Sequence, residues 1–290
     1  MSDATPPPND ATLLRIRDLQ IEFGRHDAEP MKAVKGISLE LKRGESLALV
    51  GESGSGKSVT ALSLARLLPE PPARITATEM TLDGKAILQM NERELRSIRG
   101  KEIAYIFQEP TTSLNPVLTI RTQIAEALAL HRPDVSKAGR DDEIIKWLDK
   151  VGIVDSRKRL HAYPHELSGG MQQRVMIAMA LCTQPKLLIA DEPTTALDVT
   201  IQKQIMDLLA QLRRDLDMSM ILITHNLGII RSVVDRVAVM FRGEIVETGP
   251  VDDILRNPQH DYTKALLACV PRMGAKQPRL KAIDYAVLDA

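Results

Sequence analysis

The segment GESGSGKS at residues 51–58 constrains this 290-residue chain more than any other part of its sequence. It fits the pattern G-x-x-x-x-G-K-[ST] and stands between an apolar run at 47–50 and a helix-compatible run at 59–68. Glycines let such a loop curl until several backbone N–H groups point at one anion, and the positive end of the following helix adds to the attraction. The sequence therefore predicts a phosphate-binding loop, with Lys57 at the β and γ phosphates of a nucleotide and Ser58 as a ligand of Mg²⁺. The residues expected around the nucleotide are Gly51, Glu52, Ser53, Gly54, Ser55, Gly56, Lys57, Ser58 and Val59.

The composition excludes several other classes of protein. The 38 Lys and Arg side chains balance 38 Asp and Glu side chains, so no bulk charge would attract nucleic acid or anionic lipid. Apolar residues make up 44% of the chain, yet no apolar run approaches the roughly 20 residues of a membrane span. Cys182 and Cys269 are too few for a disulfide framework or a four-cysteine metal site within the chain, and both are expected to be buried. The first ten residues carry acids and three consecutive prolines instead of the basic and apolar regions of a signal peptide, which favours a cytosolic location.

Short apolar runs alternate with helical patterns along most of the chain. Residues 47–50, 103–107, 187–190 and 220–224 are too short for buried helices, and polar or Gly-containing segments follow them. An apolar stripe within residues 201–216 has the spacing of one helix face. Buried strands that alternate with helices predict an α/β fold.

Changes in this pattern suggest the domain boundaries. An alternating strand is expected from Leu13 to Phe23, and the region from about 110 to 182 is mainly helical, with a helix that opens on the acids at 141–143 and ends at Gly152. Two apolar segments around Arg242-Gly243 predict a small antiparallel hairpin. The predicted parts are a disordered tail at 1–11, a main domain at 12–250 with a helical subdomain inserted at about 110–182, and a short C-terminal extension at 251–290.

A pair of carboxylates follows one of the buried runs. The apolar strand at 187–190 delivers Asp191 to its end, where it can hold Mg²⁺ through water, and Glu192 follows at once. Because the chain turns at a strand end, Glu192 can face an attacking water while Asp191 faces the metal. Together with the phosphate-binding loop, this pair predicts a nucleoside triphosphatase.

The segment LSGGMQQR at residues 167–174 has no place in an ordinary kinase or GTPase. Ser168 is a good N-cap, and two glycines let an anion approach the start of the next helix, so this is a second phosphate site. The segment resembles the signature motif of ATP-binding-cassette ATPases, and the resemblance extends from about residue 13 to 273. It implies a RecA-like P-loop NTPase core with the inserted helical subdomain and a small antiparallel β element. It also implies ATP and Mg²⁺ as cofactors and a head-to-tail dimer, in which the signature residues act on the partner's ATP. These residues are Ser168, Gly169, Gly170 and Gln172.

The other motifs of this family match residue by residue. Gln108 resembles the Q-loop glutamine, which contacts Mg²⁺ or the attacking water and links the core to the helical subdomain. Asp198, in Ala196-Leu-Asp198, resembles the D-loop aspartate, and His225 resembles the switch histidine that contacts the γ-phosphate. Phe23 is placed like the aromatic residue that stacks on adenine. The resemblance thus assigns Glu192, His225 and Gln108 to catalysis, and Ser58, Gln108 and Asp191 to the metal.

Two further segments, at 108–116 and 257–267, are similar to the peptide-importer group of these cassettes, which includes nickel and glutathione relatives. Asp261 stands where the group usually has proline, although it could cap the following helix, and Asn226 stands where aspartate is usual. The resemblance implies a peripheral ATPase subunit on the cytoplasmic face of the cell membrane that drives uptake of peptides or a related solute. The implied partners are a second cassette, integral membrane permease subunits and, indirectly, a solute-binding protein, with no nucleic acid. A soluble cassette ATPase of DNA repair or translation is the alternative, whereas a small-molecule kinase would leave residues 167–173 unexplained.

Overall fold

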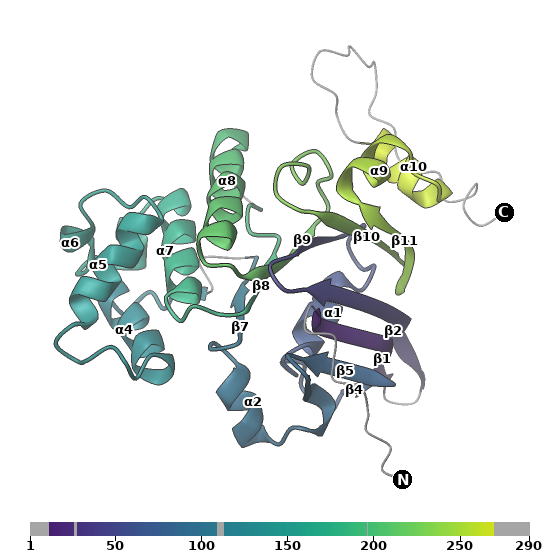
Figure 1. The fold of residues 1–290 in the computed structure, drawn as a ribbon, viewed down its shortest axis with the longest axis horizontal. Helices are drawn as coiled ribbons and strands as arrows, with labels where there is room; N and C mark the ends of the chain where they lie inside the picture. Colours follow the sequence, from purple (N-terminus) through teal and green to yellow (C-terminus); the bar gives the residue numbers. More distant parts are fainter. Residues whose placement is uncertain (1–11, 26–27, 109–112, 196, 270–290) are drawn as a thin grey trace, which may run out of the picture. The chain divides into compact units, whose positions relative to one another are not determined.

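The computed structural model describes residues 12–25, 28–108, 113–195 and 197–269, and these divide into two compact units (Figure 1). The first unit is Met1–Met90 with Leu222–Ala290, and the second is Asn91–Ile221. This division encloses more of the chain than the helical subdomain expected at about 110–182, so the boundaries drawn from the sequence stay a prediction. The expected disordered tail at 1–11 and the end of the C-terminal extension lie outside the described residues.

An antiparallel sheet forms the first half of the first unit (Figure 1). Strand β1 (Thr12–Arg25) pairs along its length with β2 (Ala28–Lys42), and on its other side with β4 (Ala73–Thr76) and β5 (Glu79–Leu82), while β6 (Lys85–Ala86) pairs with β5. The alternation expected from Leu13 to Phe23 is confirmed as a strand. Strand β2, equally long, was not anticipated.

The second half of this unit contains the strand that leads to the phosphate-binding loop. Strand β3 (Ser46–Val50) is fully buried and runs parallel to β10 (Arg236–Phe241), which forms a hairpin with β11 (Glu244–Pro250). Both turn residues have positive φ, 48° at Arg242 and 88° at Gly243. That is the twist a two-residue hairpin requires, and the predicted hairpin is confirmed.

Helices complete the first unit. Helix α1 (Lys57–Ser63) starts two residues before the run expected at 59–68 and ends earlier, and a 3₁₀ turn, η1 (Ile87–Gln89), follows β6. Helices α9 (Val251–Arg256) and α10 (Asp261–Ala268) follow the hairpin. The suggestion that Asp261 caps α10 is wrong, because the cap is His260, whose Nδ1 accepts from the Tyr262 N–H at 3.1 Å. Asp261 lies in the first turn and pairs with Lys264 at 2.8 Å, where its charge still complements the helix dipole.

The second unit combines two parallel strands with a group of helices. Strand β7 (Ile103–Ile106) pairs with β8 (Leu187–Asp191), and strand β9 (Ser219–Thr224) runs across the boundary of the two units. The helical segments are α2 (Glu92–Ile98), α4 (Ile120–His131), α5 (Arg140–Lys150), α6 (Ser156–Arg159), the 3₁₀ turn η2 (Pro164–Glu166), α7 (Gly169–Leu181) and α8 (Val199–Asp215). Helices α4, α5 and α7 pack against one another (Figure 1).

Helix α5 shows how local signals set an element of this unit. Three acids lie in its first turn, Ile144 and Leu148 are fully buried, and Gly152 follows the C-cap with φ +76°. Its largest side chain, Trp147, is 1% exposed and donates from Nε1 to Glu143 at 3.0 Å. Burial of such side chains contributes about 2–3 kcal/mol each, so the apolar stripe holds the helix in place.

Two expectations from composition can be compared with the structure. Cys182 is buried, and its burial raises the thiol pKa to about 12, so it behaves as a small apolar residue. Cys269 is only partly buried, so that half of the expectation is wrong. In the part of the chain that the structure describes, every helix is too short or too polar to span a bilayer.

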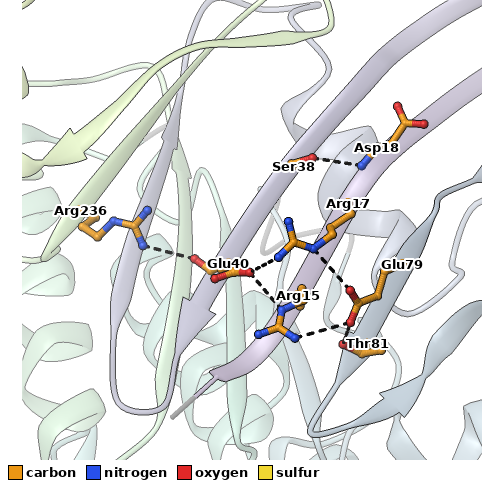
Figure 2. Close-up of polar contacts among 8 residues, drawn as sticks. All are labelled: Arg15, Arg17, Asp18, Ser38, Glu40, Glu79, Thr81 and Arg236. Carbon is orange, nitrogen blue, oxygen red and sulfur yellow. Dashed lines mark hydrogen bonds and ion pairs between the residues drawn. The ribbon is translucent and has the colours of Figure 1, made fainter. Parts of the chain in front are cut away.

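A network of charges covers the solvent face of strands β1, β2 and β5. Figure 2 shows Arg15 and Arg17 between two acids, Glu40 and Glu79. Both arginines lie 3.0 Å from the same Glu40 oxygen, and they approach Glu79 at 3.8 and 3.5 Å. The backbone oxygen of Glu40 also accepts from Arg236 at 3.3 Å (Figure 2). Because Glu40 and Arg17 are 45% and 54% exposed, solvent screens the network and its contribution to stability is small.

Replacing Glu40 tests this estimate. Glu40→Gln should lower the free energy of unfolding by about 0.5–1 kcal/mol at low salt, because both arginines lose their shared anion, and the difference should shrink at high salt. Urea denaturation at two salt concentrations measures both effects. Glu29→Gln, at an exposed acid on the same strand, is the matched control. A decrease in the free energy of unfolding of more than about 2 kcal/mol, equal at both salt concentrations, would contradict the view that solvent screens this network.

Candidate functional site

The phosphate-binding loop lies tightly against two neighbouring strands in the first unit. Gly51 has φ +152°, and a Cβ added there would lie 2.1 Å from the carbonyl oxygen of Met240 on β10. Gly56, the N-cap of α1, has φ +103°, and its added Cβ would lie 2.7 Å from the carbonyl oxygen of Ala33 on β2. An L side chain fits neither position, so these two glycines set the course of the loop.

The lysine of the loop is folded back over the loop itself. Lys57 is 5% exposed, and its Nζ donates to the backbone oxygen of Glu52 at 2.7 Å and to Oγ of Ser55 at 3.3 Å. The N–H of Ser55 donates to the same Glu52 oxygen at 3.2 Å. These bonds hold the ammonium within the curl of the backbone, where the sequence predicts that phosphates bind.

The other predicted residues of the first unit lie at the ends of its elements. Ser58 is exposed and Val59 half-buried in the first turn of α1, and Phe23 is half-buried near the end of β1. His225 is exposed just after β9. The next residue, Asn226, shapes this turn, because its N–H donates to Thr224 at 3.0 Å and its Oδ1 accepts from the Gly228 N–H at 2.9 Å.

In the second unit, the predicted catalytic carboxylate meets the predicted Q-loop glutamine. Glu192 directly follows β8 and has φ +46°, a left-handed conformation that is uncommon for a residue other than glycine. Its Oε2 accepts from Nε2 of Gln108 at 3.3 Å and from Oγ1 of Thr195 at 3.0 Å. Two motifs 84 residues apart in sequence therefore come together. Their catalytic roles remain predictions.

A cavity of about 530 Å³ lies beside Gln108. Gln108 and Asp191 provide polar groups in its wall, whereas the aromatic rings of Tyr105 and Phe107 stack with centroids 5.7 Å apart. Phe107 is 43% exposed, so part of its apolar ring faces solvent. The full lining is Tyr105, Phe107, Gln108, Ser113, Met176, Met179 and Asp191. Of the importer-type segment at 108–116, residues 109–112 lie outside the described part of the chain.

The predicted signature residues start helix α7. Ser168 is exposed and caps the helix, with its Oγ accepting from the Met171 N–H at 3.4 Å, and Gly169 is exposed as well. Gly170 is half-buried, and a Cβ there would lie 3.1 Å from Ile201 on α8. The N-terminus of α7 therefore packs closely against the start of helix α8.

Gln172 lies in the first turns of α7 but faces its own loop. Its Nε2 donates to the carbonyl oxygens of Pro164 and Leu167, at 2.9 and 3.1 Å. The sequence analysis placed Gln172 among the residues that touch the partner's ATP. In the structure, its amide instead holds residues 164–168, the signature loop, against the start of α7.

The same arrangement occurs at two other helices, a pattern that sequence reasoning missed. Gln202 donates to the carbonyls of Thr194 and Leu197, and Gln123 to those of Asn115 and Leu118, at 3.0 to 3.2 Å. Each glutamine lies four residues after a helix N-cap: Thr119, Ser168 and Asp198. The signal was a capping residue followed four positions later by Gln.

The D-loop is held in the same way. Asp198 is exposed and caps α8, with Oδ1 accepting from the Ile201 N–H at 2.9 Å, and Gln202 bonds the loop just before it. Ala196, the first residue of the predicted motif, lies outside the described residues.

The predicted metal ligands supply the oxygen donors that Mg²⁺ prefers. Ser58 offers a hydroxyl, Gln108 an amide oxygen and Asp191 a carboxylate, while no thiolate or imidazole is among them. Among the described residues, no group of three or more His, Cys, Asp or Glu side chains could hold a metal. An ion held by so few protein ligands would complete its shell with phosphate and water, as Mg²⁺ commonly does.

Comparisons with known proteins agree with the family and the fold predicted from the sequence. Residues 34–195 match the family model described as ABC transporter, and residues 246–290 match that of the oligopeptide/dipeptide transporter C-terminal region. The oligopeptide transport ATP-binding protein OppD of Bacillus subtilis is 50% identical over 261 residues, which are 90% of this chain and 72% of that protein. The glutathione import ATP-binding protein GsiA of Escherichia coli is 48% identical over 281 residues, which are 94% of this chain and 44% of that protein.

A solved structure, the dimeric post-hydrolysis state of the ATP-binding cassette MJ0796 bound to ADP and Pi, aligns with a TM-score of 0.72 and 27% identity. It covers 82% of this chain and 99% of its own. The P-loop α/β fold that the sequence predicted is confirmed. The chain is an ATP-binding-cassette ATPase.

More narrowly, the chain belongs to the ABC transporter family, and the two relatives are ATP-binding proteins named for oligopeptide transport and for glutathione import. The alternative of a soluble cassette ATPase in DNA repair or translation gains no support from these matches.

The two hydrogen bonds from Gln172 to loop carbonyls lead to a prediction about this residue. Gln172→Leu should lower the free energy of unfolding by about 1–2 kcal/mol, because two loop carbonyls lose their donor. ATP turnover should fall further than ATP affinity, because the phosphate-binding loop is untouched while the signature loop is loosened. Chemical denaturation and steady-state kinetics measure the two effects. Gln211→Leu, at an exposed glutamine on α8, should change stability by less than about 0.5 kcal/mol, and equal losses in both variants would contradict the proposed support.

Proposed function

We propose that this chain hydrolyses ATP to drive uptake of peptides, or of a related solute such as glutathione, through separate membrane permease subunits. Support comes from one feature above all: a complete set of cassette motifs in a chain whose residues 246–290 match the oligopeptide/dipeptide transporter C-terminal region. The relatives OppD and GsiA are named for oligopeptide transport and glutathione import. The chain spans less than half of GsiA. The identity of the transported solute is therefore a proposal and does not follow from that match.

Hydrolysis proceeds by attack of water on the γ-phosphorus of ATP, in line with the bond to the β–γ bridging oxygen. Glu192 accepts the proton of the water, and the bridging oxygen leaves with ADP. The hydrogen bonds that Glu192 accepts from Gln108 and Thr195 support this role, since they orient its carboxylate. Lys57 and His225 stabilise the charge on the phosphoryl oxygens.

Ser58, Gln108 and Asp191 would hold Mg²⁺, with Asp191 acting through water. The ion supplies positive charge to the β and γ phosphates when it is bound. Phe23 stacks on adenine, and the amides of residues 51–59 bind the phosphates.

A single chain carries a phosphate-binding loop and a signature helix, so the catalytic unit is a head-to-tail dimer of cassettes. The partner's Ser168, together with its glycine amides, closes on the γ-phosphate, while the partner's Gln172 holds the loop before them in place, and Asp198 lies at the dimer contact. The second cassette is either another copy of this chain or a sister chain. Formation of the dimer makes hydrolysis depend on two subunits.

The permease subunits dock on the second unit, next to the Gln108 loop. Support comes from the cavity of about 530 Å³ lined by Phe107, Gln108 and Met179, where an exposed ring provides an apolar contact. Movement of Gln108 then links the docked permease to Glu192. The subunit works peripherally, on the cytoplasmic face of the cell membrane, and a solute-binding protein delivers cargo to the permease.

Two substitutions separate binding from hydrolysis. Glu192→Gln should lower ATP turnover by about 100-fold or more while leaving ATP affinity nearly unchanged, because only the proton acceptor is lost. Lys57→Ala should instead weaken ATP binding by at least about tenfold. Calorimetric titration and phosphate release measure the two quantities. Glu126→Gln, at an exposed residue of α4, is the matched control, and undiminished turnover in Glu192→Gln would remove Glu192 from the mechanism.

The head-to-tail geometry predicts rescue between two inactive variants. Ser168→Arg blocks the signature and Lys57→Ala disables the phosphate-binding loop, so each variant alone should be inactive. In a mixed dimer one composite site carries both lesions and the other carries neither, so ATPase activity should return. Activity is measured after mixing, under conditions where scattering shows that the chain self-associates. If dimers form and no activity returns, the signature does not act across the subunit boundary.

A further inference from the structure

The C-terminal helix α10 places a tyrosine against the phosphate-binding loop of the same unit. Tyr262 is fully buried, and its hydroxyl oxygen accepts a hydrogen bond from the backbone N–H of Glu52 at 3.1 Å. Its ring stacks on Phe241, at the end of β10, with centroids 4.2 Å apart. Tyr262, Phe241 and Arg242 line a hollow of about 180 Å³ together with the loop residues Glu52, Ser53, Gly54 and Ser55.

The bonded amide belongs to Glu52, whose backbone oxygen holds the ammonium of Lys57. The backbone oxygen of Glu52 accepts from Nζ of Lys57 at 2.7 Å and from the N–H of Ser55 at 3.2 Å. Tyr262 therefore fixes one side of Glu52, while Lys57 and Ser55 occupy the other. A shift of Glu52 would move the carbonyl oxygen that positions the ammonium.

The tyrosine is itself held firmly in place. Glu247 on β11 accepts from the N–H groups of Gln259 and His260, at 2.7 and 3.1 Å, and His260 caps the helix that carries Tyr262. Burial alone would raise the pKa of Glu247, yet these hydrogen bonds keep it below its usual value, so the carboxylate stays charged at neutral pH. Burial raises the pKa of Tyr262, so its hydroxyl stays neutral.

We propose that Tyr262 is a positioning residue for the phosphate-binding loop, through which the C-terminal region that marks this group of transporters sets the affinity for ATP. The inference rests on the proposed role of Lys57. It assigns a task within the ATPase to a helix that lies outside the nucleotide motifs. Sequence reasoning identified the segment at 257–267 only as a mark of the group.

The variant Tyr262→Phe tests this role because it removes the hydroxyl and keeps the ring. In the full chain, the dissociation constants for ATP and ADP should rise about 2- to 10-fold, the loss of one hydrogen bond. The dissociation constant for AMP, which lacks the β and γ phosphates, should change less than about twofold. Hydrogen exchange of the Glu52 amide, resolved by mass spectrometry, should become faster.

Two control variants accompany Tyr262→Phe. Tyr163→Phe makes the same chemical change in the other unit and should alter none of these quantities. Leu266→Ala removes a buried side chain from α10 without touching the hydroxyl, so it should lower the unfolding temperature more than Tyr262→Phe but weaken ATP binding less. If affinity instead follows stability across the two α10 variants, or if ATP and AMP weaken equally, the role of Tyr262 is merely structural and the proposal is wrong.

Lys57→Ala distinguishes failure of this proposal from failure of the proposed function. If Lys57→Ala loses ATP affinity while Tyr262→Phe keeps both its affinity and its Glu52 exchange rate, only the role of Tyr262 is overturned. If Lys57→Ala binds ATP normally, the assignment of the phosphate-binding loop fails and the role of Tyr262 fails with it.

Discussion

The close approach of Gly51 to the carbonyl oxygen of Met240 is the contact on which the phosphate-binding loop depends. A side chain at residue 51 would meet that oxygen at 2.1 Å, so the loop can leave β3 on this course only with glycine. The parallel pairing of β3 with β10 brings the two residues together, and the bonds from Lys57 to the Glu52 carbonyl then close the curl. The strands of the first unit thus fix the backbone course of the phosphate-binding loop.

Three loops in the second unit are held by side-chain hydrogen bonds to their backbone carbonyl groups. They lie at helix starts, where regular strand or helix partners cannot satisfy their carbonyl groups. Gln123, Gln172 and Gln202 each reach back from the following helix to two of those carbonyls. One side chain thereby fixes the cap and the loop before it as a single piece. This gives the signature loop and the D-loop a defined shape, although Ser168 and Asp198 are exposed to solvent.

Local signals explain what could be predicted without coordinates. Positive φ at Arg242 and Gly243, the acids at the start of α5 and the Ser168 cap are determined within a few residues, and all three agree with the structure. Strand β2 was missed, since glycine and lysines interrupt its apolar alternation and it is defined by its long pairing with β1. The cap of α10 was assigned one residue too late because aspartate is a more common cap than histidine.

The sequence by itself determined the motifs of this protein and the family they indicate: the G-x-x-x-x-G-K-[ST] loop, the segment at 167–174 and a pair of carboxylates at a strand end, each set by short-range spacing. Only the tertiary structure decided which distant groups share a hydrogen bond. Gln108 meets Glu192 across 84 residues, and Tyr262 meets Glu52 across 210. Such pairs leave no periodic trace in the chain, because sheet pairing and helix packing, not local propensity, bring their backbones within reach.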